Sequence, residues 1–261
     1  MNHTRWDAEV YDRIGTPMRR WAQQVIHDLA LAGDEVVLDA GCGSGSVTFD
    51  LLERLPRGKI YAVDSSVEMI DKLVRGMRER GIDQIVPILA DLTSFTLPEA
   101  VDVVFSNAVF HWIDDDDGLF GSLLQATKPG GRMRAQCGGG EIFARLMPVV
   151  RDVAARPPYA PYVGGYCGGK RYRSVEEAAG ALARAGWTQV RAWTFSAPVV
   201  FEDDDEAALY LRTIILRDHV ARLPEGRGEA YVRDVVAEYV RRYGPPFTAD
   251  YVRLNLAAVR P

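Results

Sequence analysis

The sequence is poor in the residues that build metal centres and disulfide frameworks. Its 261 residues include three cysteines and four histidines. Cys42, Cys137 and Cys167 are too scattered for a CxxC metal pair and odd in number for a disulfide set, which predicts reduced thiols. The histidines show no ligand spacing such as HxxxH, so we expect no metal site.

Long apolar runs and an excess of positive charge are also missing. No uninterrupted run approaches the ~20 residues of a membrane span, and the first residues, MNHTRWDAEVYDR, carry charges where a signal peptide has an apolar core. The net charge of −5 gives no reason to expect a nucleic acid or an anionic membrane as partner, although a local basic patch stays open. We expect a soluble, cytoplasmic monomer or homodimer.

A glycine-rich stretch, EVVLDAGCGSGS at residues 35–46, is the most informative part of the chain. A short β-branched run breaks into three alternating glycines, Gly41, Gly43 and Gly45, and a helical pattern begins almost at once. Glycine has no Cβ and tolerates positive φ, so such a turn lets bare backbone N–H groups approach a ligand. The stretch predicts a strand, a tight turn and the start of a helix.

Apolar strand patterns alternate with helical patterns over most of the chain. Strands are expected at 35–40, 59–63, 85–90, 101–106, 132–137, 189–196 and 249–259, and helices at 17–33, 47–55, 67–80, 114–127, 142–156, 174–185, 202–219 and 225–243. This alternation predicts parallel β-α units with right-handed crossovers and helices on both faces of the sheet. The Pro-, Gly- and Tyr-rich stretch 159–172 is expected to be a loop.

Acidic residues stand at the ends of the next two strands. Asp64 lies about 20 residues beyond the glycines, where a carboxylate can accept both hydrogen bonds of a ribose diol, and Asp91 ends the following strand. Asp64 alone also fits NAD, but a dinucleotide site prefers GxGxxG, and Ser46 stands where its third glycine would be. A purely structural turn, or Asp91 as a plain cap, stays open as an alternative.

The run Asp39-Ala-Gly-Cys-Gly-Ser-Gly resembles motif I of the class I S-adenosylmethionine-dependent methyltransferases, and Ala90-Asp91-Leu92 resembles that family's adenine-binding position. The resemblance implies a Rossmann-like, seven-stranded, mostly parallel sheet with one antiparallel strand. It also implies S-adenosylmethionine as cofactor and S-adenosylhomocysteine as product. The residues implied in cofactor binding are Asp39, Gly41, Gly43, Gly45, Asp64, Ser65, Asp91, Leu92, Asn107 and Trp6.

The resemblance extends to SNAVFHWIDD, KPGGRM, WTFSAP and YVRLNLAAVR, which are similar to the branch of trans-aconitate methyltransferase and malonyl-carrier O-methyltransferases. It implies that Asn107 lies beside the cofactor and that the amino-terminal segment with Trp6 and Tyr11 folds over it. His111 stands where trans-aconitate methyltransferase has Gln. His111-Trp112 looks instead like the His-Trp pair with which plant salicylate-type carboxyl methyltransferases bind the acceptor carboxylate.

The domain organisation follows from the same resemblance. One methyltransferase domain is expected over residues 1–261, with an amino-terminal cap segment (1–33) and a cofactor-binding half (34–140). The substrate-side half (141–261) carries a helical insertion at about 202–244 that serves as a lid. The loop 159–172 is a further lid candidate.

Methyl transfer to a carboxylate needs alignment more than acid–base chemistry, because a carboxylate with a pKa near ~4 is already ionised at neutral pH. The resemblance and the His111-Trp112 pair imply O-methylation of a small carboxylic acid, with His111, Trp112 and Tyr11 at the acceptor. A C-, N- or phenol O-methyltransferase, with His111, Glu141 or Tyr11 as base, and a non-catalytic cofactor-binding protein stay open. For His111 and Trp112 an ordinary packing role also stays open.

Arginines could supply further contacts to an acid. Arg19, Arg20, Arg171 and Arg173 are candidates for bidentate binding of a carboxylate. A solvated position on the surface is the expectation for each of them.

Overall fold

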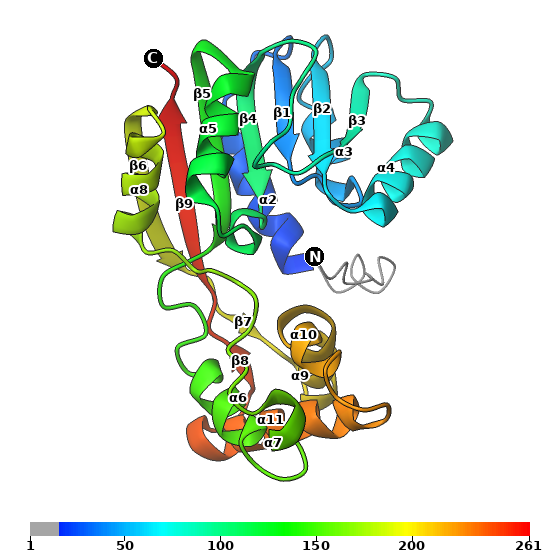
Figure 1. Ribbon diagram of the computed structural model, residues 1–261. Coiled ribbons are helices and arrows are strands. Elements are labelled where there is room, and N and C mark those ends of the chain that lie inside the picture. Colours follow the sequence, from blue (N-terminus) through cyan, green and yellow to red (C-terminus); the bar gives the residue numbers. More distant parts are fainter. Residues whose placement is uncertain (1–15) are drawn as a thin grey trace. The chain divides into compact units, whose positions relative to one another are not determined.

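The computed structural model describes residues 16–261 and divides into two compact units (Figure 1). Unit 1 contains the described residues up to Gly140, together with Arg173–Thr194 and Leu254–Pro261. Unit 2 contains Glu141–Tyr172 and Phe195–Arg253. The chain therefore leaves unit 1 twice. The predicted single-domain organisation and the lid roles of 159–172 and 202–244 stay predictions.

A seven-stranded sheet forms the centre of unit 1, in the order β3-β2-β1-β4-β5-β9-β6. Six strands are parallel and one is antiparallel, as predicted. The reversed strand is β9, because Gly130 near the start of β5 donates to Arg260 just after β9, at 2.9 Å. The strands are β1 (Val36–Ala40), β2 (Lys59–Asp64), β3 (Ile85–Leu89), β4 (Val101–Asn107), β5 (Thr127–Gly138), β6 (Thr188–Ser196) and β9 (Val252–Val259).

Helices cover both faces of this sheet, which confirms the layering that the sequence predicts. Neighbouring side chains of β1 point to opposite faces, as the two-residue period of a strand requires. Leu38 packs with residues of the helices α5 and α8, whereas Val37 packs with residues of α2, α3 and α4. The helices of unit 1 are α2 (Thr16–Asp28), α3 (Ser46–Leu52), α4 (Val67–Arg80), α5 (Asp116–Ala126), α8 (Val175–Arg184) and the 3₁₀ helix η1 (Phe110–Trp112).

Two expected boundaries at the strands are wrong. Residues 128–131, expected as a turn, belong to β5, because the backbones of Gly130 and Gly131 pair with Arg260 of the carboxyl-terminal segment. The expected final strand 249–259 is divided into β8 (Thr248–Ala249) and β9, with Asp250 and Tyr251 between them.

Unit 2 is mainly helical and differs most from expectation. The expected helix 202–219 is three elements. The α-helix changes to a π-helix at Leu211, and Leu216, at φ −104° and ψ 13°, leaves the helical region before the third element. The expected helix 142–156 begins only at Leu146, after Phe143 at φ 60°. The elements are α6 (Leu146–Ala154), α7 (Ala160–Val163), β7 (Val199–Val200), α9 (Asp204–Tyr210), the π-helix η2 (Leu211–Ile215), α10 (Arg217–Val220), α11 (Arg227–Tyr243) and β8.

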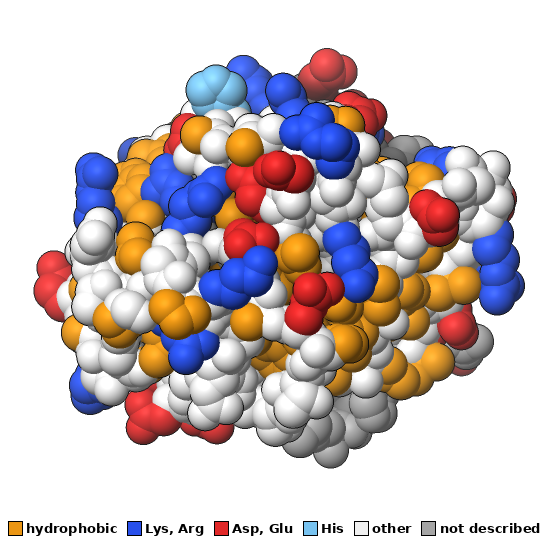
Figure 2. Space-filling model, turned by 90° about the horizontal axis from the view of Figure 1, so that it is seen from above, with side chains coloured by type: hydrophobic (Ala, Val, Ile, Leu, Met, Phe, Trp, Pro, Cys, Tyr) orange, Lys and Arg blue, Asp and Glu red, His pale blue; other side chains and the backbone are white. Residues whose placement is uncertain are grey.

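Charges of both signs are mixed on the surface seen from above Figure 1. Figure 2 shows Lys and Arg side chains interspersed with Asp and Glu side chains and with apolar atoms, so neither sign forms a continuous patch on this face. None of the helices in the described part of the chain combines the length and the apolar character needed to cross a bilayer.

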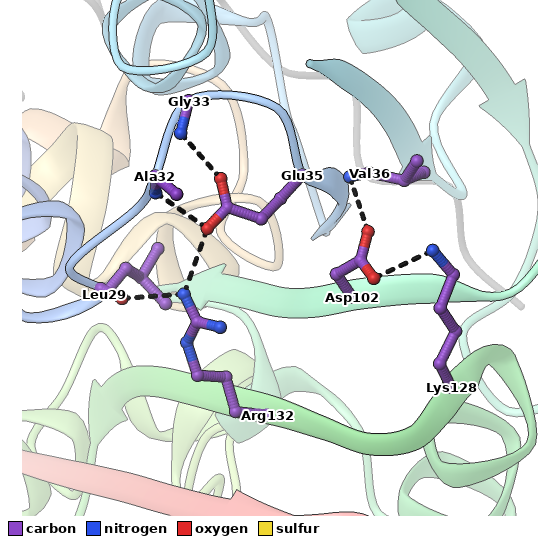
Figure 3. Close-up of polar contacts among 8 residues, drawn as sticks. All are labelled: Leu29, Ala32, Gly33, Glu35, Val36, Asp102, Lys128 and Arg132. Carbon is purple, nitrogen blue, oxygen red and sulfur yellow. Dashed lines mark hydrogen bonds and ion pairs between the residues drawn. The ribbon is translucent and has the colours of Figure 1, made fainter. Parts of the chain in front are cut away.

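Two carboxylates join the amino-terminal ends of β1, β4 and β5 (Figure 3). Glu35 accepts hydrogen bonds from the backbone N–H groups of Ala32 and Gly33, at 2.8 and 2.9 Å, and from Arg132. Asp102 accepts from the backbone of Val36 at 2.9 Å and from Lys128. This network lies at the opposite end of the strands from the glycine turn, which follows the carboxyl-terminal end of β1.

Candidate functional site

The glycine turn connects β1 to α3 and is fixed to the neighbouring strand β2. The N–H groups of Gly41 and Cys42 both donate to the carbonyl of Val63, at 2.8 and 3.0 Å. Gly41, Gly43 and Gly45 have φ values of 85°, 55° and 88°, in the region that favours glycine. The predicted strand, turn and helix are therefore present, with the predicted backbone.

The three glycines serve different purposes. A Cβ on Gly41 would lie 2.3 Å from Val109 Cγ2, and a Cβ on Gly45 would lie 2.4 Å from Leu73 Cδ1. These two glycines thus allow close packing. A Cβ on Gly43 would meet no heavy atom of the described residues within 4 Å. Residues 16–261 therefore leave this position open to a ligand that approaches the backbone.

Asp64 is held at the rim of this turn. Its Oδ2 accepts from the backbone N–H of Gly43 at 2.9 Å, and its Oδ1 accepts from that of Ser66 at 2.9 Å. Burial raises the pKa of Asp64, against the lowering effect of the hydrogen bonds from Ser66 and Gly43. Ser65, the next predicted residue, is exposed at the start of the turn into α4. The structure thus brings Asp64 and the central glycine into direct contact.

Asp39 supports the turn from the protein interior. It is 2% exposed, and the Thr48 hydroxyl donates to its Oδ2 at 2.7 Å. Burial, with a further contribution from the charge of Asp64, raises the pKa of Asp39 to about 7. The carboxyl of Asp39 therefore joins β1 to α3.

Asp91 and Leu92 follow the neighbouring strand β3. Ala90 donates to the carbonyl of Asp64 at 3.0 Å, which keeps this segment beside the end of β2. Asp91 Oδ1 accepts from the N–H and the hydroxyl of Thr93, at 2.9 and 2.7 Å, so one oxygen forms the capping turn considered as the alternative. Asp91 is exposed and its Oδ2 takes no part in that turn, whereas Leu92 is buried in the core.

Asn107 ends β4 with an unsatisfied buried oxygen. Its Nδ2 donates to the carbonyl of Met18 at 3.4 Å, but its Oδ1 is buried and has no hydrogen-bond partner within the described part of the chain. Ala108, the next residue, has a φ of 62°, which turns the chain sharply after the strand. A buried acceptor without a donor is costly, which indicates a ligand or water at this position.

His111 and Trp112 lie on η1, immediately after this turn. His111 is 8% exposed, and its Nδ1 accepts a hydrogen bond from the backbone N–H of Gly138 at 3.2 Å. The neutral ring therefore carries its proton on Nε2 and acts there as a donor. Trp112 is 37% exposed, so it is not a core residue, and its ring lies 5.4 Å from that of His111.

One of the four arginines departs from the expected solvated position: Arg173 is 2% exposed and pairs with Asp116. Arg19 pairs with Asp50, but its side chain stays 59% exposed. Nothing in the sequence distinguishes Arg173 from its neighbour Arg171, since the partners of Arg173 lie about 60 residues earlier in the chain.

The remaining predicted residues lie elsewhere or outside the described part. Trp6 and Tyr11 lie outside residues 16–261. Glu141 is the first residue of unit 2. Within residues 16–261, no group of three or more His, Cys, Asp or Glu side chains is arranged to hold a metal ion.

Comparisons with known proteins fit this arrangement. A family model described as "Methyltransferase domain" matches residues 37–131, from β1 to the start of β5. The trans-aconitate 2-methyltransferase of Azoarcus sp. strain BH72 is 28% identical over 98% of this chain and 99% of its own length. The enzyme of the same name from Methylobacterium nodulans is 30% identical over 70% of this chain and 69% of its own length.

The chain belongs to the S-adenosylmethionine-dependent methyltransferases. Its fold is shared with a protein of known structure, YcgJ of Bacillus subtilis, with a TM-score of 0.65 at 13% identity over 92% of this chain and 98% of that protein. The cofactor of this methyltransferase is S-adenosylmethionine. The open space at Gly43 and the unsatisfied oxygen of Asn107 both fit a ligand of this kind.

Proposed function

We propose that this methyltransferase methylates a carboxylate oxygen of a small organic acid. The observation that carries the proposal is the hydrogen bond from Gly138 N–H to His111 Nδ1. It leaves the neutral imidazole with a donor at Nε2, which suits an anionic oxygen. A general base would need an unprotonated nitrogen that faces the acceptor. The unprotonated nitrogen of His111 is Nδ1, which already accepts from the backbone N–H of Gly138.

The cofactor would be held along the carboxyl-terminal ends of β1 to β4, where open α/β sheets bind ligands. Asp64 would accept from the ribose hydroxyls, and Asp91 Oδ2 from the adenine amine. Asn107 Oδ1 would accept from the methionyl ammonium. The residues proposed to form this site are Asp39, Gly41, Gly43, Gly45, Asp64, Ser65, Asp91, Leu92 and Asn107, with Trp6 completing it.

When bound, S-adenosylmethionine supplies a methyl group attached to a cationic sulfur, and this sulfur is the leaving group that keeps the electron pair of the broken S–C bond. The carboxylate oxygen provides the pair for the new O–C bond, so no proton is transferred. His111 Nε2–H would orient this oxygen, Trp112 would exclude water beside it, and Tyr11 would lie at the acceptor. The work of these residues is alignment.

The acceptor class follows from the relatives. Two curated relatives are named trans-aconitate 2-methyltransferase, which favours a small acid with several carboxylates as acceptor. We also propose a cytoplasmic monomer or homodimer.

The His111→Asn variant tests the proposal, because asparagine retains a donor but lacks a titratable ring. We expect kcat/KM for the acid to fall about 10- to 100-fold, the size of effect that misalignment causes. The pH dependence of kcat should stay flat near neutrality in both enzymes, since the acceptor needs no base. His27→Gln, on the exposed face of α2, is the matched control.

A different result would favour the rival chemistry. A neutral-range ionisation in the pH–rate profile of the wild-type enzyme, lost in His111→Asn, would identify His111 as a base. The acceptor would then be a phenol, an amine or a carbon acid.

A further inference from the structure

The Arg173 side chain holds the segment that carries His111 and Trp112. Its Nη1 donates to the carbonyl of Phe110 at 2.7 Å, and its Nη2 donates to that of Ile113 at 2.6 Å. These two carbonyls flank His111-Trp112 in the chain. The carbonyl of Phe110 also accepts from Ile113 N–H at 3.3 Å, so the guanidinium adds a second donor there. Its planar fork contacts both ends of η1 and thereby fixes this segment.

The third donor of Arg173, Nε, contacts the next helix, α5. Nε donates to Asp116 Oδ1 at 2.6 Å, and both side chains are almost fully buried. Asp116 is the first residue of α5, where a negative charge is favoured by the helix dipole. One guanidinium therefore joins η1 to the start of α5.

The backbone of Arg173 contacts the segment 138–140, which supplies the hydrogen-bond donor to the His111 ring. Its carbonyl accepts from Gly140 N–H at 2.8 Å, two residues after Gly138, which donates to His111 Nδ1. Gly139, between them, has no space for a side chain, since a Cβ there would lie 2.9 Å from the Arg173 carbonyl oxygen. Arg173 thus fixes both the segment that carries the ring and the segment that supplies the N–H to it.

We propose that Arg173 is a positioning residue that keeps the His111 imidazole in its Nε2–H tautomer and in the orientation that receives the acceptor carboxylate. The proposal rests on the role of His111 given above. Because the Arg173 side chain is 2% exposed and donates to Asp116 and two carbonyls, it acts through His111 rather than on the acceptor.

The Arg173→Lys variant tests this proposal. Lysine keeps a positive charge for the ion pair with Asp116, but it cannot donate to the carbonyls of Phe110 and Ile113 at the same time with the planar geometry of a guanidinium. We expect kcat/KM for the acid to fall about 10- to 100-fold while the Kd of S-adenosylhomocysteine is unchanged. The ¹⁵N shifts of the His111 ring nitrogens should move from the pure Nε2–H form to a mixture of tautomers. Arg184→Lys, exposed at the end of α8, is the matched control.

A folded Arg173→Lys enzyme with wild-type ring-nitrogen shifts would overturn the proposal, whatever its activity. If that variant does not fold, Asp116→Asn replaces it, because it keeps the two carbonyl acceptors and weakens only the contacts of Nε and Nη2 with the Asp116 carboxylate. The ring shifts should then move in the same direction by a smaller amount, and unchanged shifts would again overturn the proposal. If the wild-type enzyme methylates no acid, the proposed function fails, while the ring shifts still decide on Arg173.

Discussion

Gly43 differs from Gly41 and Gly45 because, of the three Cβ positions, only that of Gly43 meets no atom of the described residues. We predict that Gly43→Ala folds with a loss of about 1 kcal/mol, the strain of a side chain at positive φ, but binds S-adenosylhomocysteine at least tenfold more weakly. The reason is that the new methyl group occupies the space proposed for the cofactor. Calorimetric titration measures the affinity.

Gly41→Ala is the comparison for this variant. Its methyl group would collide with Val109, so we expect a further loss of about 1–3 kcal/mol in the free energy of unfolding. Wild-type affinity of Gly43→Ala for S-adenosylhomocysteine would show that the open space is not the cofactor site.

Ionisation of the buried Asp39 carboxyl should lower the free energy of unfolding of the cofactor-free protein as the pH rises. The unfolded carboxyl ionises near 3.8 and the folded one near 7, so the folded state binds more protons in this range and stability falls from about pH 4 to pH 7. Three pH units correspond to a cost of up to about 4 kcal/mol above pH 7. We predict that Asp39→Asn raises the free energy of unfolding at pH 8 and changes it little at pH 4.

Urea unfolding at the two pH values measures this difference. Asp34→Asn, at an exposed position just before β1, is the control. An equal effect of Asp39→Asn at pH 4 and pH 8 would contradict the account of the buried carboxyl.

At the scale of elements, the amino-terminal ends of the strands depend on the network of Figure 3. Burial alone would raise the pKa of Glu35, but the backbone hydrogen bonds from Ala32 and Gly33 outweigh it and lower the pKa. A carboxylate with a lowered pKa stabilises the fold above its unfolded value of 4.5, and this contribution is lost as the pH falls through the folded value.

We predict that Glu35→Gln lowers the free energy of unfolding at pH 7 by about 1–2 kcal/mol, because an amide N–H₂ must face a backbone N–H. The difference from the wild type should shrink as the pH falls below 4.5 and through the lowered folded pKa, because the wild-type carboxyl then becomes neutral as well. Urea unfolding at pH 7 and pH 3.5 measures it, with Glu53→Gln at the exposed end of α3 as control. A constant difference at both values would contradict the electrostatic origin.

The sequence predicted elements where local pattern decides the structure. Alternating apolar strands and helices identify the sheet, and Ser174 caps α8 as expected, through a reciprocal pair with Glu177. Prediction from the sequence failed where contacts with residues far apart in the chain determine the structure. Residues 128–131 become strand because Gly130 and Gly131 pair with Arg260, just after β9. Arg173 is buried because its side chain contacts η1 and α5.

At the scale of the whole molecule, the described residues of the proposed site belong to unit 1. The strand-end motifs are short and local, so the sequence located the glycine turn, Asp64 and Asp91 without knowledge of the fold. The tautomer of His111 and the unsatisfied oxygen of Asn107 depend on contacts with Gly138 and on burial, and no motif records them. Unit 2, with its π-helix and divided helices, was the least predictable part.

The central claim is that this methyltransferase esterifies a small carboxylic acid. The most direct measurement uses the purified chain with S-adenosylmethionine labelled with ¹³C in the methyl group and trans-aconitate, followed by ¹³C NMR of the product. We predict a labelled methyl ester that mild base returns to the acid, with one S-adenosylhomocysteine formed for each ester. Label on nitrogen, carbon or a phenol oxygen of another acceptor, with none transferred to any acid of a broad panel, would contradict the claim.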